Sequence, residues 1–201
     1  MQESTKTKEI LGESFLEEYI SNKKVLDIGC GDDPVTQAAE KFDLEDGDAN
    51  YIDRYLQKNT YDTVYASHCL EHMHNPYNCL ERWFSLVKKN GHLIIIIPDG
   101  ELYEQDQFPS LFNSDHKHIF YDQLEKEKDK HIDIPNLFKS LQNGNIILYE
   151  LQDNHYNYNL KFTKKKPFFL LHHRIQKFLL KRIHIKLFYK ILLYLHALGI
   201  P

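Results

Sequence analysis

The sequence has 201 residues, of which 42% are hydrophobic and 27% are charged, and its formal net charge is −4. This composition is ordinary for one globular domain with an appendage. No apolar run reaches about 18 residues, so we expect no membrane-spanning helix. The polar N-terminus lacks the apolar core of a signal peptide, and three irregularly spaced cysteines exclude a disulfide framework. A reducing cytoplasm fits best.

Charge is distributed unevenly along the chain. Residues 161–201 contain ten of the 25 lysines and arginines and none of the 29 acids. The body is therefore acidic and the tail is basic, which predicts an anionic partner for the tail.

The first part of the chain alternates between helix and strand patterns. Apolar residues at helical spacing predict an amphipathic helix over 8–22, and a short buried strand follows over 23–29. The connection at 38–49 is too short for a full crossover helix and strand. A second strand is predicted over 61–67.

A second helix is predicted to open at Asn75 and Pro76 and to end at "KKNG", residues 88–91. The continuous apolar run over 92–98 is typical of a strand buried on both faces of a parallel sheet. After it, residues 99–135 mix aromatic, acidic and histidine residues without one period, which indicates a functional lid.

The last elements of the predicted domain are a helix over 135–144 and two strand patterns, 145–153 and 155–163, joined by a short turn. Strands that alternate with helices predict an α/β fold with a mostly parallel sheet, helices on both faces and an antiparallel C-terminal hairpin. We expect a domain over 1–163 and a basic, apolar helical appendage over 164–201.

The stretch "VLDIGCGDDP", from Val25 to Pro34, places two glycines directly after a strand. Bare backbone at this point suits a ligand that approaches the carboxyl end of the sheet. The lysine of a phosphate-binding P-loop is absent, and Pro34 stands where a dinucleotide fingerprint has its third glycine. The remaining cofactor class for this arrangement is S-adenosylmethionine.

Further motifs follow in order: "FDLEDGDA", "YDTVYASHCLEHMHNP", "LVKKNGHLIIIIPD" and "LYEQDQFPSLFNSDHKHIF". With them, the sequence from Lys24 to Asp153 resembles the class I S-adenosylmethionine-dependent methyltransferases of the type-11 group. The resemblance implies a Rossmann-like sheet, S-adenosylmethionine as cofactor and S-adenosylhomocysteine as product. Asp33 departs from the motif, which often has a third glycine there.

The chemistry of this cofactor assigns roles to residue types. Asp27 would hold the cofactor's ammonium, directly or through water, and a carboxylate after the second strand would accept the ribose hydroxyls. Asp43 is our choice for the ribose, with Glu45 as the alternative; both also fit a solvated acidic turn. The resemblance assigns Asp48 to the adenine amine. The full predicted cofactor set is Asp27, Gly29, Cys30, Gly31, Asp43, Asp48, Ala49, Ser67, His68, Leu70 and His72.

His116, in "DHKHIF", is the candidate catalytic base or substrate ligand, because an oxygen nucleophile benefits from a group with the pKa of histidine. The alternative is that His116 and its neighbours Tyr103, Glu104 and His118 only close the pocket. His72 likewise either orients a ligand or caps the following helix. The possible metal ligands match no standard zinc spacing, so we expect no metal site: Cys69, His72, His74, Cys79, His116 and His118.

The predicted function is methylation, with oxygen the expected acceptor atom, of a small molecule or of a cell-surface or lipid-linked glycan. Two alternatives stay open: a nicotinamide-binding oxidoreductase, and a cofactor-binding scaffold without turnover. The basic tail over 164–201 predicts peripheral contact with an anionic membrane, and covering a sheet face or a homodimer partner is its alternative. No known RNA-binding motif is present, so nucleic acid is not an expected partner.

Overall fold

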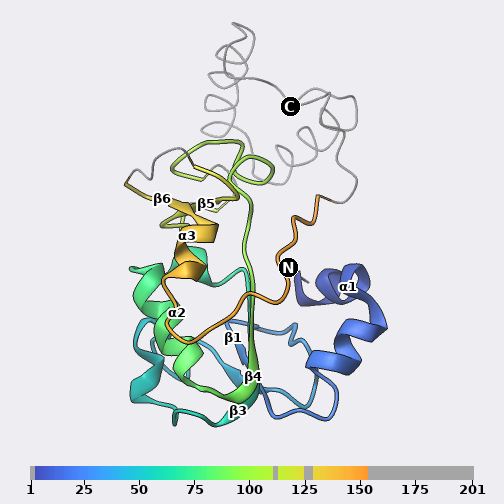
Figure 1. Cartoon of the computed structure of the whole chain (residues 1–201). Coiled ribbons are helices and arrows are strands. Elements are labelled where there is room, and N and C mark those ends of the chain that lie inside the picture. The colour runs from blue at the N-terminus through green and yellow to red at the C-terminus, as the bar shows by residue number, and fades with distance from the viewer. Residues whose placement is uncertain (1–2, 111–112, 125–128, 154–201) are drawn as a thin grey trace, which may run out of the picture. The chain divides into compact units, whose positions relative to one another are not determined.

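Figure 1 shows the computed structural model of the protein. The structure describes residues 3–110, 113–124 and 129–153. The chain divides into two compact units, Met1–Gln152 and Asp153–Pro201, and the second lies almost wholly outside the described residues. The predicted appendage lies there too, so the predicted domain boundary at residue 163 stays a prediction.

The described helices and strands follow the alternating order expected from the sequence. They are α1 (Glu3–Tyr19), β1 (Val25–Ile28), β2 (Glu40–Phe42), η1 (Ala49–Arg54), β3 (Tyr61–Ser67), η2 (Leu70–His72), α2 (Pro76–Ser85), β4 (Val87–Ile96), β5 (Ile119–Tyr121), β6 (His131–Asp133) and α3 (Ile134–Lys139). None of these helices has the length and apolar character that crossing a bilayer requires.

The main sheet has the strand order β2-β1-β3-β4, and every pairing in it is parallel. Leu26 lies opposite both Glu40 and Val64, so the carboxyl ends of β1, β2 and β3 meet at one edge. β5 and β6 form a second, two-stranded parallel sheet, which an isolated bridge between Asp99 and Phe120 links to the segment after β4. The predicted mostly parallel α/β fold is confirmed.

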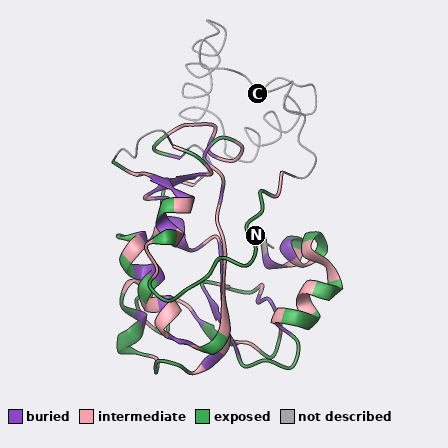
Figure 2. Ribbon diagram, viewed as in Figure 1, coloured by how far each residue is buried: buried purple, intermediate pink, exposed green. Residues whose placement is uncertain are grey.

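Helices cover both faces of the main sheet, as Figures 1 and 2 show. Because side chains alternate along a strand, Val25 and Tyr65 pack on one face beside the end of α1. Leu26 and Val64 face the opposite side and form the larger core with Trp83 of α2 and its neighbours. The prediction of helices on both faces is confirmed by this division.

The second helix ends earlier than predicted. α2 stops at Ser85, and Lys88, Lys89, Asn90 and Gly91 belong to β4 instead of to a helix end. The pairing of β3 with β4 changes register here, and Asn90 adopts a positive φ of 63°. The prediction that residues 88–91 end the helix is therefore wrong.

The strand β4 was expected to be buried on both faces, yet its apolar residues 93–96 are only half-buried. β4 is the edge strand of the main sheet in the described part of the chain, so it lacks a neighbour on one side. Residues 145–153 do not form the first strand of the predicted hairpin: they have no regular structure, and residues 146–149 are exposed. The second predicted strand lies outside the described residues.

Candidate active site

The turn after β1 presents backbone without side chains. Gly29 and Gly31 adopt positive φ values of 74° and 55°, and both are exposed. A Cβ added at Gly31 would meet no atom within 4 Å, whereas one at Gly29 would lie 2.7 Å from the sulfur of Cys69. The turn therefore has open space at Gly31 and close contact with the segment after β3 at Gly29.

Asp43 lies directly after β2 and contacts this turn. Its carboxylate accepts hydrogen bonds from the Gly31 N–H, at 3.2 Å, and from the Cys30 thiol, at 3.6 Å. Glu45 is exposed, and no contact with the glycine turn is recorded for it. The structure thus brings the first-choice carboxylate, and not the alternative, to the crevice edge.

Asp48 and Ala49 begin η1, next to this edge. The Asp48 carboxylate caps the helix by accepting from the Asn50 backbone N–H at 2.9 Å and from its side chain at 2.7 Å. These hydrogen bonds hold the pKa of Asp48 below its ordinary value, so it is ionised at neutral pH. The Ala49 carbonyl accepts from the Trp83 indole N–H at 2.9 Å, which ties this segment to the core.

Asp27 is fully buried beneath the turn. Its Oδ2 accepts from the Val35 N–H at 2.6 Å, and its Oδ1 has no hydrogen-bond partner among the described residues. Burial raises the pKa of Asp27 to about 7, and the nearby carboxylates of Asp43 and Asp33 raise it further against the hydrogen bond from Val35. The structure shows Asp27 fixing the far end of the turn, and its contact with an ammonium stays a prediction.

The segment after β3 closes the other side. Ser67 ends the strand, and His68 takes a positive φ of 52° before η2 begins. Leu70 is fully buried in the larger core, so its side chain does not line an open crevice. Cys69 is buried as well and packs against Gly29.

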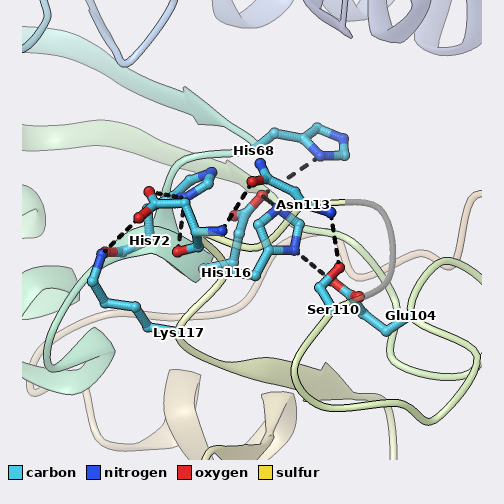
Figure 3. A network of polar contacts seen from close by, with 9 residues as sticks. His68, His72, Glu104, Ser110, Asn113, His116 and Lys117 are labelled. Atoms are coloured by element: carbon cyan, nitrogen blue, oxygen red, sulfur yellow. Dashed lines mark hydrogen bonds and ion pairs between the residues drawn. The ribbon is translucent and has the colours of Figure 1, made fainter. Parts of the chain in front are cut away.

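Four titratable side chains meet at η2, namely Glu71, His72, Glu104 and His116, and Figure 3 labels the last three. His116 Nδ1 lies 2.5 Å from Glu104 Oε1, and His116 Nε2 lies 3.8 Å from Glu71 Oε1. The rings of His72 and His116 are edge to face, with centroids 4.9 Å apart. Glu71, Glu104 and His116 are buried, while His72 is partly exposed.

The segment that carries His116 is attached to η2 at several points. The Lys117 N–H donates to the Glu71 carbonyl at 2.8 Å, and its ammonium donates to the His72 carbonyl at 2.7 Å. His72 Nδ1 lies 2.9 Å from a carboxylate oxygen of Asp115. The predicted lid therefore delivers His116 to the end of β3.

A methyltransferase domain model matches residues 6–129. This match covers more than half of the chain and includes the glycine turn, Asp43 and the cluster around His116. The chain belongs to this methyltransferase family. No functionally curated protein matches the sequence.

The solved structures that match this methyltransferase are distant from it in sequence. A Bacillus halodurans protein assigned as a methyltransferase is 19% identical, with a TM-score of 0.45 over 70% of this chain. An S-adenosylmethionine-dependent methyltransferase from Archaeoglobus fulgidus is also 19% identical, with a TM-score of 0.45 over 68% of this chain and 66% of its own. The present chain spans 64% of the length of the Bacillus protein.

Burial controls the charge state of the methyltransferase cluster. It raises the pKa of Glu71 to about 8, and the neighbouring Glu104 carboxylate raises it further. Burial also lowers the pKa of His72, and His116 beside it has the same effect. At neutral pH Glu71 and His72 therefore favour their neutral forms.

Sequence reasoning found His116 and His72 but missed Glu71 and Asp115. Glu71 stands between two histidines at spacings of three and one, in "HCLEH", and that pattern is a signal that could have identified it. Asp115 precedes His116 directly. Of the considered metal ligands, His72 and His116 come together with Glu71, whereas Cys69, His74, Cys79 and His118 are not part of that group.

The substitution Asp27→Asn is expected to make unfolding of the ligand-free protein less dependent on pH. The folded-state pKa of about 7 exceeds the ordinary value of 3.8, so raising the pH ionises the unfolded state first. Asp27 therefore destabilises the native protein increasingly from about pH 4 to 7, by up to a few kcal/mol.

Urea unfolding of both proteins across this pH range measures the effect. The stability gained by the asparagine variant should grow as the pH rises and level off above about pH 7. A difference between the two proteins that stays constant over the whole range would show that Asp27 does not titrate as described.

Proposed function

We propose that this methyltransferase transfers the methyl group of S-adenosylmethionine to an oxygen of a small-molecule, glycan or lipid-linked acceptor. The observation that carries the proposal is the juxtaposition of two features at one sheet edge. The glycine turn is open at Gly31, and its Gly29 packs against Cys69, which directly precedes the η2 segment that carries Glu71 and His72. A donor site and an acceptor site are thereby neighbours.

The residues of the crevice fit the donor. The space at Gly31 would accept a ligand that a side chain would exclude, and Asp43 offers carboxylate oxygens beside it. Asp48 and Ala49 would contact the adenine end from the start of η1. When bound, S-adenosylmethionine supplies a methyl group on a positively charged sulfur. Asp43 and Asp48 give the crevice an acidic character that favours this cation.

The acceptor end supplies a proton acceptor. Glu104 holds Nδ1 of His116, which leaves Nε2 directed toward Glu71 and able to take a proton. As the acceptor oxygen bonds to the methyl carbon, the carbon–sulfur bond breaks and its electron pair stays on sulfur. The acceptor proton passes to His116. The main work of the remaining residues is alignment and exclusion of water.

The acceptor and its location are proposed from the tail. Residues 164–201 are basic and apolar with no acids, a composition that suits the surface of an anionic membrane on its cytoplasmic side. An acceptor attached to a lipid would be presented there. The same segment could instead pair with a second copy of the chain, which sedimentation with and without anionic vesicles would separate.

Calorimetric titration tests the proposal. S-adenosylhomocysteine should bind the full chain with a micromolar dissociation constant, while NAD should not bind. The opposite result would restore the oxidoreductase alternative, which family membership disfavours. Binding of S-adenosylhomocysteine without transfer of a labelled methyl group to any glycan or lipid-linked hydroxyl would support the scaffold alternative.

A further inference from the structure

The cluster at η2 contains a carboxylate that the proposed reaction does not need. Glu71 is fully buried, and neither of its oxygens accepts a hydrogen bond within the described residues. The nearest ring nitrogens, His68 Nδ1 and His116 Nε2, lie 3.6 Å and 3.8 Å from Oε1. These separations exceed the ordinary hydrogen-bond range. Buried carboxylates are usually paired, hydrogen-bonded or bound to a metal.

Two further carboxylates contact imidazoles of this cluster, one on His116 and one on His72. Glu104 is fully buried, with Oε1 on His116 and Oε2 without a hydrogen-bond partner in the described chain. Asp115 lies against His72 from the outside. This arrangement places three carboxyl groups, those of Glu71, Glu104 and Asp115, around the two imidazoles of His72 and His116. Lys117 is the nearby cation, and its ammonium is directed to the His72 carbonyl and to Asp115, not to Glu71.

The geometry of the cluster suits a cation at that point. One atom each from Glu71, His72 and His116 can be chosen so that all three lie within 4.8 Å of one another. Both rings have Nδ1 against a carboxylate: His72 lies on Asp115, and His116 lies on Glu104, the pair labelled in Figure 3. A carboxylate at one ring nitrogen fixes the tautomer and leaves the other nitrogen as a ligand, which is the usual outer-shell arrangement of metal-binding histidines.

We propose that Glu71, His72 and His116 bind a divalent first-row transition cation such as Zn²⁺ or Mn²⁺. Two imidazoles and one carboxylate are ligands that these ions accept. Ligands about 2.1 Å from one ion lie roughly 3 to 3.4 Å apart, so the three side chains would close in slightly on binding. Three protein ligands leave open positions for an oxygen of a second molecule.

The cation site does not depend on the proposed function. The effect of the cation on methyl transfer does rest on that function. With His116 as a ligand, its Nε2 cannot also accept the acceptor proton. An acceptor hydroxyl bound to the cation becomes more acidic and releases its proton to solvent. Its oxygen then attacks the methyl carbon, and the sulfur again leaves with the electron pair. Removing the cation by chelation should therefore slow methylation to the rate of the histidine-base route, whereas a protein that uses only the histidine base would be unaffected.

Titration of the metal-free full chain with Co²⁺ tests the site, because Co²⁺ bound by nitrogen and oxygen ligands absorbs visible light and Zn²⁺ should displace it. The chain has 12 histidines, so the readout is the difference between variants and not total uptake. Glu71→Gln is expected to weaken Co²⁺ binding at least about 100-fold, and Glu104→Gln about tenfold. His92→Gln, at the opposite end of the sheet, is the matched control and should change nothing.

Folding of the variant is checked in the same experiment. Glu71→Gln keeps the shape of a buried side chain whose oxygens accept no hydrogen bond in the described chain, so the metal-free variant should melt at the same temperature or higher. Co²⁺ should raise the melting temperature of the parent but not of this variant. Equal Co²⁺ affinity in parent and Glu71→Gln, with normal binding of S-adenosylhomocysteine, overturns the cation site alone. Loss of S-adenosylhomocysteine binding in the parent would overturn the proposed function alone.

Discussion

Replacing Gly31 with alanine is expected to lower the affinity for S-adenosylhomocysteine at least about tenfold while the protein stays folded. An added Cβ would meet no protein atom within 4 Å, so it would point into open space at the crevice. The positive φ of 55° adds a backbone cost of about 1 kcal/mol. The affinity is measured by calorimetry and the stability by urea unfolding.

Gly12→Ala is the control for this prediction. Gly12 has φ 77° and ψ 178° within α1, a conformation that is nearly restricted to glycine, and a Cβ there also meets nothing within 4 Å. Gly12→Ala should therefore cost at least as much stability as Gly31→Ala without weakening the ligand. If the two variants lose the same affinity, the effect comes from general destabilisation, and Gly31 does not line the cofactor site.

Replacing Trp83 with alanine is expected to give the largest loss of stability, about 3 to 5 kcal/mol. Trp83 is fully buried in the larger core between α2 and the main sheet, and its indole N–H donates to the Ala49 carbonyl at 2.9 Å. Such a loss is a large part of the total stability of a typical domain. Trp83 is the single tryptophan of the chain, so unfolding must be followed by circular dichroism and not by fluorescence.

Trp83→Phe separates packing from hydrogen bonding. It keeps most of the buried ring and removes the bond to Ala49, so it should cost about 1 to 2 kcal/mol. Because Ala49 belongs to the predicted adenine side, this variant should also weaken S-adenosylhomocysteine binding slightly. A loss as large as that of Trp83→Ala would mean that the hydrogen bond, and not burial of the ring, dominates at this position.

Local signals predicted the centre of the fold well. The strands at Val25–Ile28 and Tyr61–Ser67 are short apolar runs bounded by turn residues, and their parallel pairing follows from the connections between them. Errors arose where tertiary context overrides the local pattern. The sequence "KKNG" suits a helix end, but pairing with β3 recruits it into β4. The apolar run at 145–153 suits a strand, yet it pairs with none of the described strands.

Site residues next to a predicted strand could be located from the sequence, whereas residues that only folding brings together could not. The glycine turn and Asp43 are adjacent to strands, so periodicity located them. His116 and Glu104 are 12 residues apart, and only the folded lid shows that they form a pair. Glu71 follows buried Leu70 in the sequence. It stands out because no described group donates a hydrogen bond to its carboxyl oxygens. No sequence pattern reports such an absence.

The attachments of Lys117, Asp115 and His116 to the η2 segment have a consequence for access. All three belong to one short stretch of the lid, and each is bonded to η2 or to Glu104. If that stretch moved outward, the His116 ring, the Asp115 carboxylate that contacts His72 and the Lys117 ammonium would all leave η2 together. If His116 acts as proposed, the open segment cannot carry out proton transfer, and a molecule that enters by opening it reacts only after the segment has closed again.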